Sequence, residues 1–484
     1  MGYSKVEDVI MNFKNKKFPL QIFRAYDIRG KITFLTPELV EAVAYGLVCQ
    51  YQQAAQTTVV IGYDARLSSP AYAQIIQTIF EKQGFNVVNV GCCSSPMLYY
   101  SARQFAGNGI MVTASHNPKS DNGIKWIMQG QPPCPEMIQQ VAYVASLQFS
   151  PQRKVSMPAL THQFDVSYCL QYQHAILDDI QLQRPFHVVL DGLHGSAGRC
   201  AVLVLQKLGC QVTALRCESN GEFPDHAPDP SQACHLKALT ATVQQQQADI
   251  GIALDGDGDR LVLVDEHGTI ISADRLMSLF AEMCLATHPQ HEIVFDVKCS
   301  TMVRNTVQEL GGQPTMIRTG STFLKKYLMQ SQGQAVFGGE YAGHYVFNDG
   351  RGFGYDDGLY AALRVLEFLS QRPDFTLSQA LDKYPERCGT EDTYISTYST
   401  DPKSLLADIE LHSHQLAAQL SNIDGVRLDF EDGFGIIRAS NTGEFFTVRF
   451  DADNPARLND IRQSFVSMLS DRYPKIAHDI LNAH

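Results

Sequence analysis

The chain has 484 residues, 44% of them hydrophobic and 19% charged, which is the composition of a globular protein with several domains. Its formal net charge is −12 and it contains no run of Lys and Arg. This balance excludes nucleic acid and an anionic membrane surface as main partners, but it leaves room for a local basic pocket that binds a phosphorylated substrate. No apolar run reaches the roughly 18 residues of a membrane span, and the first residues lack a signal-peptide core. We therefore expect a soluble, cytoplasmic protein whose 12 Cys are reduced thiols.

A β-branched run that ends in Asp occurs three times along the chain, at residues 58–64, 187–191 and 292–296. Each run is followed by a helix-like stretch, a Gly with a second strand, and a third strand that ends in a polar loop. Short apolar strands that alternate with helical segments indicate βα units. The predicted fold class is α/β, with three related α/β domains whose sheets are mixed and mainly parallel.

Clusters of turn-forming residues mark the boundaries between these repeats. Beyond residue 384 the pattern changes to alternating strands at 393–398 and 445–450 with helices between and after them, which predicts a smaller C-terminal α+β domain. The predicted domains are 1–155, 156–268, 269–384 and 385–484. Ligands of open α/β sheets bind beyond the carboxyl ends of the strands, so we expect the polar loops to face one central cleft.

The acidic loop places Asp255, Asp257 and Asp259 at alternate positions. Three carboxylates so close together repel one another unless a hard cation lies among them. An EF-hand calcium loop is one alternative, with Glu266 at its twelfth position. However, Arg260 stands where that loop requires Gly, and the flanks resemble strands where an EF-hand has helices. We therefore expect the three carboxylates to hold Mg²⁺, and a metal-free solvated turn is the remaining interpretation.

Three other loops each admit a structural and a functional interpretation. Ser115 fits a helix cap or turn residue, and it also fits a phosphate carrier whose charge Lys125 and nearby amides neutralise. The glycine-rich loop with Glu340 and His344 is either a plain turn or a site for sugar hydroxyls and phosphate. Arg438 begins a run of hydroxyl and amide side chains that either binds phosphate or forms an ordinary surface turn.

Two weaker patterns lie elsewhere in the chain. Arg24 and Arg29 in FRAYDIRG either pair within the end of a strand or contact a phosphate. Gly192, Gly195 and Gly198 follow a predicted strand and precede a helix, as the glycines of a dinucleotide-binding loop do. Their spacing is not GxGxxG and the chain contains no P-loop motif, so nucleotide binding is not expected there.

Taken together and in this order, the motifs resemble those of the α-D-phosphohexomutase family, most closely its bacterial phosphomannomutase/phosphoglucomutase branch. The resemblance covers essentially the whole chain, and five motifs in family order are strong support where one would be weak. They are FRAYDIRG at 23–30, TASHNP at 113–118, DGDGDR at 255–260, the GExxGH loop around 340–344 and RASNT at 438–442.

The resemblance implies an enzyme, an isomerase that interconverts hexose 1-phosphate and hexose 6-phosphate of mannose or glucose. The reaction would pass through a phosphoserine and a hexose 1,6-bisphosphate, with Mg²⁺ as cofactor and glucose 1,6-bisphosphate as activator. The partner would be the phosphorylated hexose, and we expect a monomer or a dimer. The alternatives are a phosphoglucosamine mutase, a catalytically weak sugar-phosphate-binding protein and, least favoured, a calcium-binding module.

The resemblance also implies a role for each site residue. Ser115 would carry the phosphate, and the catalytic residues would be Ser115, Lys125, His344 and Arg29. The metal ligands would be the phosphate on Ser115 with Asp255, Asp257 and Asp259. Substrate would contact Tyr26, Arg260, Lys298, Glu340, Arg438, Ser440, Asn441 and Thr442, with Glu340 on the 3- and 4-hydroxyls. In chain order the four predicted domains would carry the phosphoserine, the metal, the sugar site and the site for the non-reacting phosphate.

The chain departs from the family pattern at three places. Ala342 stands where the family usually has Ser, which removes a hydroxyl contact to the sugar. Ser321 stands where the branch often has His, so Lys125 and His344 remain the candidates for general acid and base. Gly-Glu follows RASNT at positions 443 and 444, where the family commonly has a pair that ends in Pro.

Overall fold

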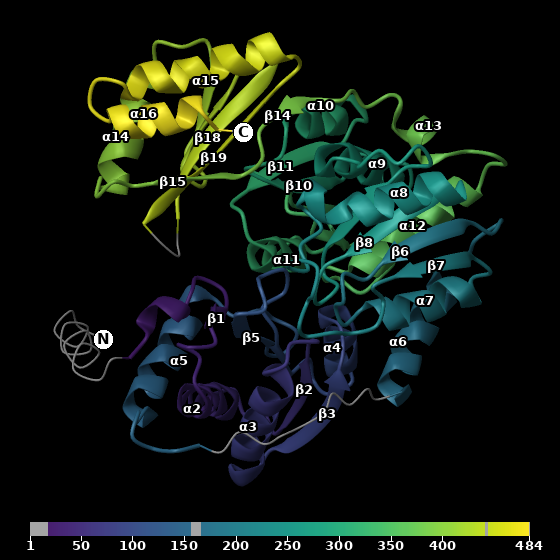
Figure 1. Cartoon of the computed structure of the whole chain (residues 1–484), viewed down its shortest axis with the longest axis vertical. Coiled ribbons are helices and arrows are strands. Elements are labelled where there is room, and N and C mark those ends of the chain that lie inside the picture. The colour runs from purple at the N-terminus through teal and green to yellow at the C-terminus, as the bar shows by residue number, and fades with distance from the viewer. Residues whose placement is uncertain (1–17, 156–165, 441–443, 484) are drawn as a thin grey trace. The chain divides into compact units, whose positions relative to one another are not determined.

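The computed structural model describes residues 18–155, 166–440 and 444–483 (Figure 1). The chain forms two compact units. The first unit comprises residues 1–271, 343–346 and 351–378. The second unit comprises residues 272–342, 347–350 and 379–484. The four-domain boundaries expected from the sequence stay a prediction.

The first sheet has the strand order β1-β5-β4-β2-β3. β2 runs parallel to β3 and β4, and β5 runs antiparallel to β4 and β1. The strands are β1 Ile28–Lys31, β2 Thr58–Tyr63, β3 Asn86–Cys92, β4 Gly109–Val112 and β5 Asp121–Ile127. The helices are η1 Leu20–Ile22, α2 Pro37–Gln53, α3 Ser69–Lys82, α4 Ser95–Arg103 and α5 Pro135–Gln148.

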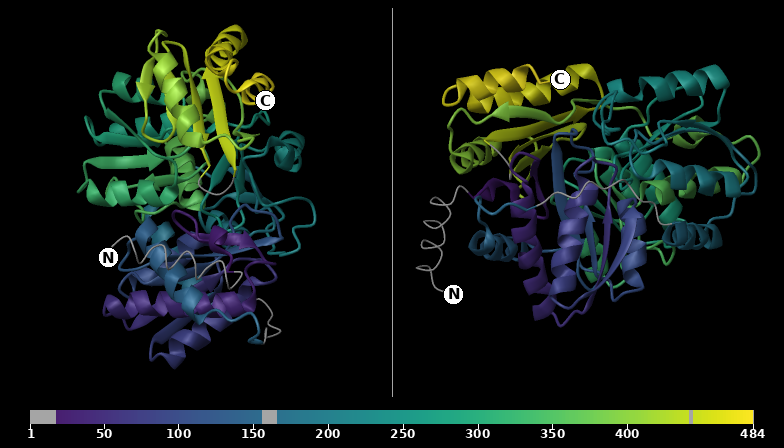
Figure 2. Two further views of the ribbon diagram at one scale, coloured as in Figure 1. Left: turned by 90° about the vertical axis from the view of Figure 1, so that its left-hand side faces the viewer. Right: turned by 60° about the horizontal axis from the view of Figure 1, so that its bottom comes forward.

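Successive side chains of β2 point to opposite faces of the sheet, and apolar residues on both faces are covered by helices, as Figure 2 shows. Val59 and Ile61 belong to a core that also contains the buried side chains of α2, α3 and α5. Gly62 faces the other way, where an added Cβ would lie 3.1 Å from Leu98 of α4. The central strand of the sheet is therefore buried on both faces.

The second sheet also belongs to the first unit and has the order β7-β6-β8-β9, with β6 parallel to β7 and β8 and β9 antiparallel to β8. The strands are β6 His187–Asp191, β7 Gln211–Leu215, β8 Ile250–Leu254 and β9 Leu261–Val264. The helices are α6 Val166–Asp179, α7 Gly198–Lys207, η2 Ala233–Leu236, α8 Lys237–Gln246 and α12 Gly358–Ser370. Strands flank the acidic loop on both sides, so its geometry is not that of an EF-hand.

The third sheet has the order β11-β10-β12-β13, with β10 parallel to β11 and β12. The strands are β10 Glu292–Asp296, β11 Gln313–Ile317, β12 Ala335–Gly339 and β13 Tyr345–Phe347. The helices are α9 Ala273–Leu285, α10 Thr301–Glu309, α11 Ser321–Gln330 and α13 Leu377–Leu381. All three sheets place the first strand of the repeat between the second and the third, so the predicted repeat is confirmed as three related α/β folds.

The C-terminal sheet is antiparallel, in the order β14-β19-β18-β17-β16 with β15 also paired to β19. The strands are β14 Cys388–Gly389, β15 Thr393–Ser396, β16 Gln419–Ser421, β17 Val426–Asp429, β18 Gly433–Ala439 and β19 Phe445–Ala452. Helices α14 Pro402–Ser413, α15 Pro455–Leu469 and α16 Pro474–Leu481 share one core with this sheet, drawn from green to yellow in Figure 1. The predicted C-terminal α+β fold is confirmed.

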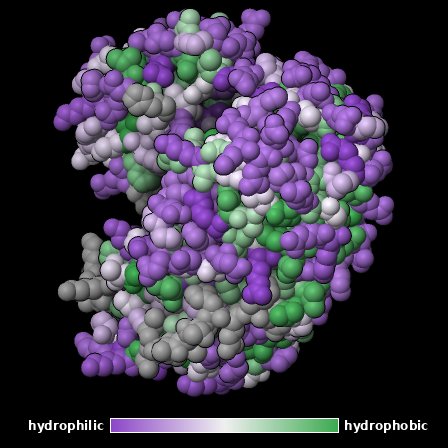
Figure 3. Space-filling model, turned by 45° about the vertical axis from the view of Figure 1, so that its right-hand side comes forward, coloured by the Kyte–Doolittle hydropathy of each residue, from purple (hydrophilic) through white to green (hydrophobic). Residues whose placement is uncertain are grey.

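Hydrophilic side chains dominate the face drawn in Figure 3, with smaller groups of hydrophobic ones between them. Within the described part of the chain, no helix combines the length and the apolar character that a membrane crossing requires.

Candidate active site

The reactive groups of the first unit come from loops that follow buried strands and from the strand β5. Ser115 lies three residues beyond the parallel strand β4, and the acidic loop of residues 255–260 directly follows the parallel strand β8. Lys125 lies on β5, in register with Met111 of β4. The two sheets thus bring together residues that are up to 140 positions apart in the sequence.

The hydroxyl of Ser115 binds the acidic loop. Its Oγ donates a hydrogen bond of 2.6 Å to Asp255 Oδ2 and lies 3.2 Å from His116 Nδ1. The backbone of Ser115 has φ of 52°, a left-handed conformation that is uncommon for residues other than Gly. Non-glycine residues adopt such conformations in turns and also at functional sites, where the surrounding structure fixes them.

Lys125 is the counter-charge of the acidic loop. Its Nζ lies 2.6 Å from Asp257 Oδ2 and 2.8 Å from Asp259 Oδ2. Burial disfavours the Lys125 ammonium, but the attraction of the two carboxylates outweighs it and raises the pKa of Lys125. Burial and the negative charges of Asp259 and Asp257 raise the pKa of Asp255 well above its usual value. One ammonium therefore does not offset three buried carboxylates.

The acidic loop fits a hard divalent cation. Single carboxylate oxygens of Asp255, Asp257 and Asp259 lie within 4.8 Å of one another. All three side chains are buried, and the Oδ1 atoms of Asp257 and Asp259 have no hydrogen-bond partner. Unpartnered buried carboxylate oxygens are costly, and oxygen ligands in this number are what Mg²⁺ takes from proteins. The structure thus contains an acidic, metal-competent cluster where the sequence predicts one.

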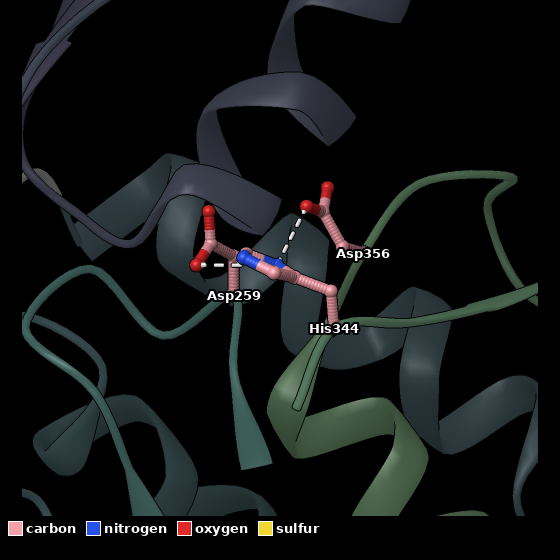
Figure 4. A group of neighbouring side chains, drawn as sticks. All are labelled: Asp259, His344 and Asp356. Carbon is pink, nitrogen blue, oxygen red and sulfur yellow. Dashed lines mark ion pairs between the residues drawn. The ribbon is translucent and has the colours of Figure 1, made fainter. Parts of the chain in front are cut away.

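His344 lies between Asp259 of this cluster and one further carboxylate, Asp356 (Figure 4). Its Nδ1 is 3.0 Å from Asp356 Oδ2 and 3.7 Å from Asp259 Oδ1. Its Nε2 accepts a hydrogen bond of 3.1 Å from Nε of Arg260. The imidazole is thus held by a hydrogen bond at Nε2 and lies close to two carboxylates at Nδ1, as suits a group that exchanges a proton or binds an anion.

Arg29 and Tyr26 lie near the serine loop of the first unit. Arg29, on β1, pairs with Asp27 at 2.8 Å, and its Nη1 donates to Asn117 Oδ1 at 3.4 Å. Tyr26 is half-buried in the turn before β1. The structure therefore gathers six of the predicted catalytic and metal-binding residues of this unit into one cluster around Ser115, with Tyr26 in the turn that precedes Arg29.

The second unit holds a separate group of predicted substrate-binding residues. Lys298 Nζ donates to Asp392 Oδ2 at 2.5 Å, and Glu340 Oε1 accepts from the amide of Gly320 at 2.5 Å. Arg438 pairs with Asp424 at 2.7 Å. Each of these side chains is already oriented by a partner of opposite charge or by a backbone amide.

The remaining predicted residues are placed only in part. Ser440 donates its amide to the carbonyl of Phe445, whereas Asn441 and Thr442 lie outside the described residues. Ser321 is the first residue of α11, and Ala342 is half-buried.

Three family models match consecutive parts of the chain. They are the α/β/α domains I, II and III of phosphoglucomutase/phosphomannomutase, at residues 20–146, 170–268 and 272–388. The chain belongs to the phosphoglucomutase/phosphomannomutase family. The predicted membership of the α-D-phosphohexomutases is thereby confirmed, and with it the prediction of an isomerase that interconverts hexose 1- and 6-phosphates.

Relatives match along nearly the full length of this family member. A phosphomannomutase/phosphoglucomutase of Pseudomonas syringae is 36% identical, covering 96% of this chain and 97% of the relative. A phosphoglucomutase of Neisseria meningitidis is 35% identical, covering 93% of this chain and 96% of the relative. The crystal structure of a phosphoglucomutase/phosphomannomutase family protein from Burkholderia thailandensis superposes with a TM-score of 0.85 at 32% identity, covering 95% and 99% of the two chains.

Sequence reasoning missed three residues that shape the site of this phosphohexomutase. Ser95, at the start of α4, donates to Asp257 Oδ2 at 2.6 Å. Asp356 orients His344. Gly195 allows its turn to pack on the acidic loop, because an added Cβ there would lie 2.8 Å from the carbonyl oxygen of Gly256. The available signals were a Ser-Ser-Pro after a strand, an Asp-Asp-Gly before a helix, and the glycines that resemble a dinucleotide loop.

Proposed function

We propose that this mutase moves the phosphoryl group by way of Ser115, between the 1- and 6-positions of mannose or glucose phosphates. The observation that carries the proposal is the 2.6 Å hydrogen bond from Ser115 Oγ to Asp255, within a cluster that also holds Asp257, Asp259 and Lys125. A serine hydroxyl beside carboxylates and an ammonium fits a phosphate carrier better than a turn residue, since a turn needs none of these charges.

In the proposed reaction, phospho-Ser115 donates its phosphoryl group to the free hydroxyl of a hexose monophosphate. The bond between phosphorus and Ser115 Oγ breaks, and a bond between phosphorus and the sugar oxygen forms, which gives a hexose 1,6-bisphosphate. The sugar hydroxyl loses its proton to a base, and Ser115 Oγ regains one. The same steps in reverse, from the other phosphate, complete the isomerisation and restore the phosphoserine.

The charges of the site assign roles in this transfer. The raised pKa of Lys125 keeps it cationic, so it suits the developing negative charge of the phosphoryl group and does not suit a base. His344 is then the better candidate for the proton acceptor, and Arg29 and Arg260 add positive charge. Asp255, Asp257 and Asp259 would hold Mg²⁺, which when bound supplies positive charge to the phosphoryl oxygens. Glucose 1,6-bisphosphate would act as activator by phosphorylating Ser115.

The residues of the second unit would bind the parts of the substrate that do not react. Glu340 is suited to sugar hydroxyls, because one carboxylate accepts from two donors. Arg438, with Ser440, Asn441 and Thr442, is suited to the non-reacting phosphate, since guanidinium binds phosphate in a bidentate manner. Lys298 and Tyr26 would add further contacts. Glu340 would bind sugar hydroxyls that occupy the same place whether the 1-position or the 6-position points to Ser115. The sugar could therefore be bound in either orientation.

A coupled assay tests the proposal. Mannose 1-phosphate, glucose 1-phosphate and glucosamine 1-phosphate are each supplied with Mg²⁺ and a trace of glucose 1,6-bisphosphate. We expect turnover of mannose or glucose phosphate that is lost in Ser115→Ala. Turnover of glucosamine phosphate alone would identify a phosphoglucosamine mutase, and binding of the sugar phosphates without turnover would identify a binding protein.

A further inference from the structure

A buried arginine, Arg66, lies beneath the loop that carries Ser115. Arg66 follows β2 by three residues and is 1% exposed. Its five side-chain N–H groups are directed at five acceptors, four of which are backbone carbonyls of the serine loop. The carbonyl acceptors are Ser115 at 2.7 Å, Asn117 at 2.6 Å, Pro118 at 2.7 Å and Asp121 at 3.0 Å. The fifth acceptor is Asp64, whose Oδ2 receives Nε at 3.0 Å.

The ion pair of Arg66 and Asp64 is also linked to the amide of Ser115. Asp64 Oδ2 accepts a hydrogen bond of 2.8 Å from the hydroxyl of Thr113, and Thr113 Oγ1 in turn accepts from the Ser115 amide at 2.8 Å. The backbone N–H and C=O of Ser115 are therefore both tied to the Asp64–Arg66 pair, one through Thr113 and one directly. Such double anchoring supplies the constraint that a non-glycine residue needs to stay at φ of 52°.

We propose that Arg66 is a positioning residue that holds the serine loop in the conformation in which Ser115 Oγ meets Asp255. The inference rests on the proposed role of Ser115 as phosphate carrier. The side-chain hydrogen bonds of Arg66 go to Asp64 and to backbone carbonyls, and none goes to the acidic-loop carboxylates or to His344. Its loss therefore affects the rate of phosphoryl transfer at Ser115 and leaves substrate affinity nearly unchanged.

The geometry requires a guanidinium at this position. The planar guanidinium of Arg66 donates in several directions and so reaches four carbonyls along seven residues of chain. A Lys ammonium has only three donors, all on one nitrogen atom. Phe223 covers the guanidinium, with 5.3 Å between the Arg66 Cζ and the ring centroid. An isolated β-bridge between the backbones of Arg66 and Gly221 holds the segment with Phe223 in place. The approach is close, because a Cβ at Gly221 would lie 2.3 Å from the carbonyl oxygen of Ala65. The Arg66 side chain thus belongs to the interior and not to a substrate surface.

Arg66→Ala and Arg66→Lys test the inference against Arg351→Ala. Arg351 makes as many side-chain hydrogen bonds, to Asp179 and Glu367 in the same unit, without touching the serine loop. For each full-length variant, KM and kcat are measured well below its melting temperature. The transfer of phosphate from phospho-Ser115 to glucose 1-phosphate is stopped at a series of times. The mass of the intact protein then gives the fraction that still carries the phosphate. The assays are repeated with millimolar guanidinium chloride and, as a control for denaturant effects, with urea.

We expect kcat of Arg66→Ala to fall by about 100-fold with KM within about two-fold of wild type, as for a reacting group displaced by about 1 Å. Guanidinium, and not urea, should restore part of the rate of Arg66→Ala. Arg66→Lys should also be slow, and guanidinium should not raise its rate. Rates of both Arg66 variants equal to those of Arg351→Ala would overturn the inference, as would losses in KM alone. If Arg66→Ala does not fold, Arg66→Lys decides. A wild-type protein that never forms phospho-Ser115 would instead refute the proposed function itself.

Discussion

Ser115 Oγ lies 2.6 Å from Asp255 Oδ2, although the two residues are 140 positions apart and belong to different sheets. The contact joins the end of β4 to the end of β8 within one compact unit. A Cβ on the neighbouring Gly256 would lie 2.4 Å from the carbonyl oxygen of Ser115, so the two loops touch through their backbones as well. The serine and the acidic loop therefore form one site.

Removal of Mg²⁺ should abolish turnover without unfolding the protein. Lys125 already offsets part of the charge of the acidic loop, so the metal-free fold is viable, whereas phosphoryl transfer would lack the cation that offsets its charge. Activity and circular dichroism are measured after dialysis against EDTA. Mg²⁺ should restore the rate and Ca²⁺, which prefers a larger and looser shell, should not. Full activity in EDTA would contradict the metal assignment.

Substitution of Lys125 should make stability depend on Mg²⁺. In Lys125→Met the carboxylates of Asp257 and Asp259 lose their counter-charge, and breaking a buried pair in this way costs about 3–5 kcal/mol. The melting temperature of the variant should therefore rise more steeply with Mg²⁺ concentration than that of wild type. Thermal melts over a Mg²⁺ series compare the two proteins. Equal slopes would show that Lys125 and the metal do not serve the same carboxylates.

Asp357 should make the first unit less stable as pH rises. It caps α12 and accepts a hydrogen bond from Tyr172, and burial raises its pKa to about 7, above the ~3.9 of an unfolded Asp. The folded state thus favours the protonated form. Its stabilisation is present in full below about pH 4 and is lost as pH rises through 7, a change of up to about 4 kcal/mol.

Asp357→Asn should remove this dependence, because Asn does not titrate, while its Oδ1 can still cap α12 and its NH2 group can donate to the hydroxyl oxygen of Tyr172. Urea unfolding at several pH values between 4 and 8 gives the free energy of unfolding of both proteins. The wild type should lose stability relative to the variant across this range. Parallel pH profiles would mean that Asp357 titrates at an ordinary pKa.

Gly256→Ala should disable the site more than it destabilises the fold. The added methyl group would push against the carbonyl of Ser115 and part the two loops. Gly84→Ala is the matched control, since its φ of +84° makes Ala unfavourable there but no atom lies within 4 Å of an added Cβ. Both variants should lose about 1 kcal/mol or more of stability. Only Gly256→Ala should lose most of its kcat, and equal kcat values would contradict the contact.

Arg438→Ala should weaken substrate binding more than catalysis. A hydrogen bond to a charged group contributes about 1.5–3 kcal/mol, so KM should rise about 10- to 100-fold while kcat falls less. Asp424→Asn is the companion variant, since Asp424 holds Arg438 at 2.7 Å and also accepts from the amide of Thr319. Its KM should rise by a smaller factor. A fall in kcat at constant KM would place Arg438 on the reacting phosphate.

The sequence predicted the repeat and the chemistry of each loop because both depend on local patterns. Strand periodicity marked β2, β6 and β10, and the alternate carboxylates marked the metal-competent loop between β8 and β9. The sequence could not show that Lys125 pairs with Asp257 and Asp259, since that contact depends on the packing of two sheets. The role of Asp356 was hidden for the same reason, because its partner His344 lies on a different loop.

The glycines at 192, 195 and 198, where nucleotide binding is not expected from the sequence, have a structural explanation. Their resemblance to a dinucleotide loop reflects a need for close backbone packing and not a nucleotide. Gly195 packs on the acidic loop, and a Cβ at Gly198 would lie 2.7 Å from Cys217. The spacing of the glycines had already argued against a nucleotide, and the three-dimensional contacts show what the glycines do instead.

The most direct test of the account is a single turnover from the phosphorylated protein. Wild-type protein is phosphorylated with glucose 1,6-bisphosphate, freed of excess ligand, and mixed with mannose 1-phosphate or glucose 1-phosphate and Mg²⁺. Quenched samples are analysed by peptide mass for the site of the phosphate and by chromatography for the sugar product. The account predicts phosphate on Ser115 that passes to the sugar as a 1,6-bisphosphate at a rate no slower than kcat. Phosphate on another residue, or isomerisation while Ser115 stays unmodified, would contradict it.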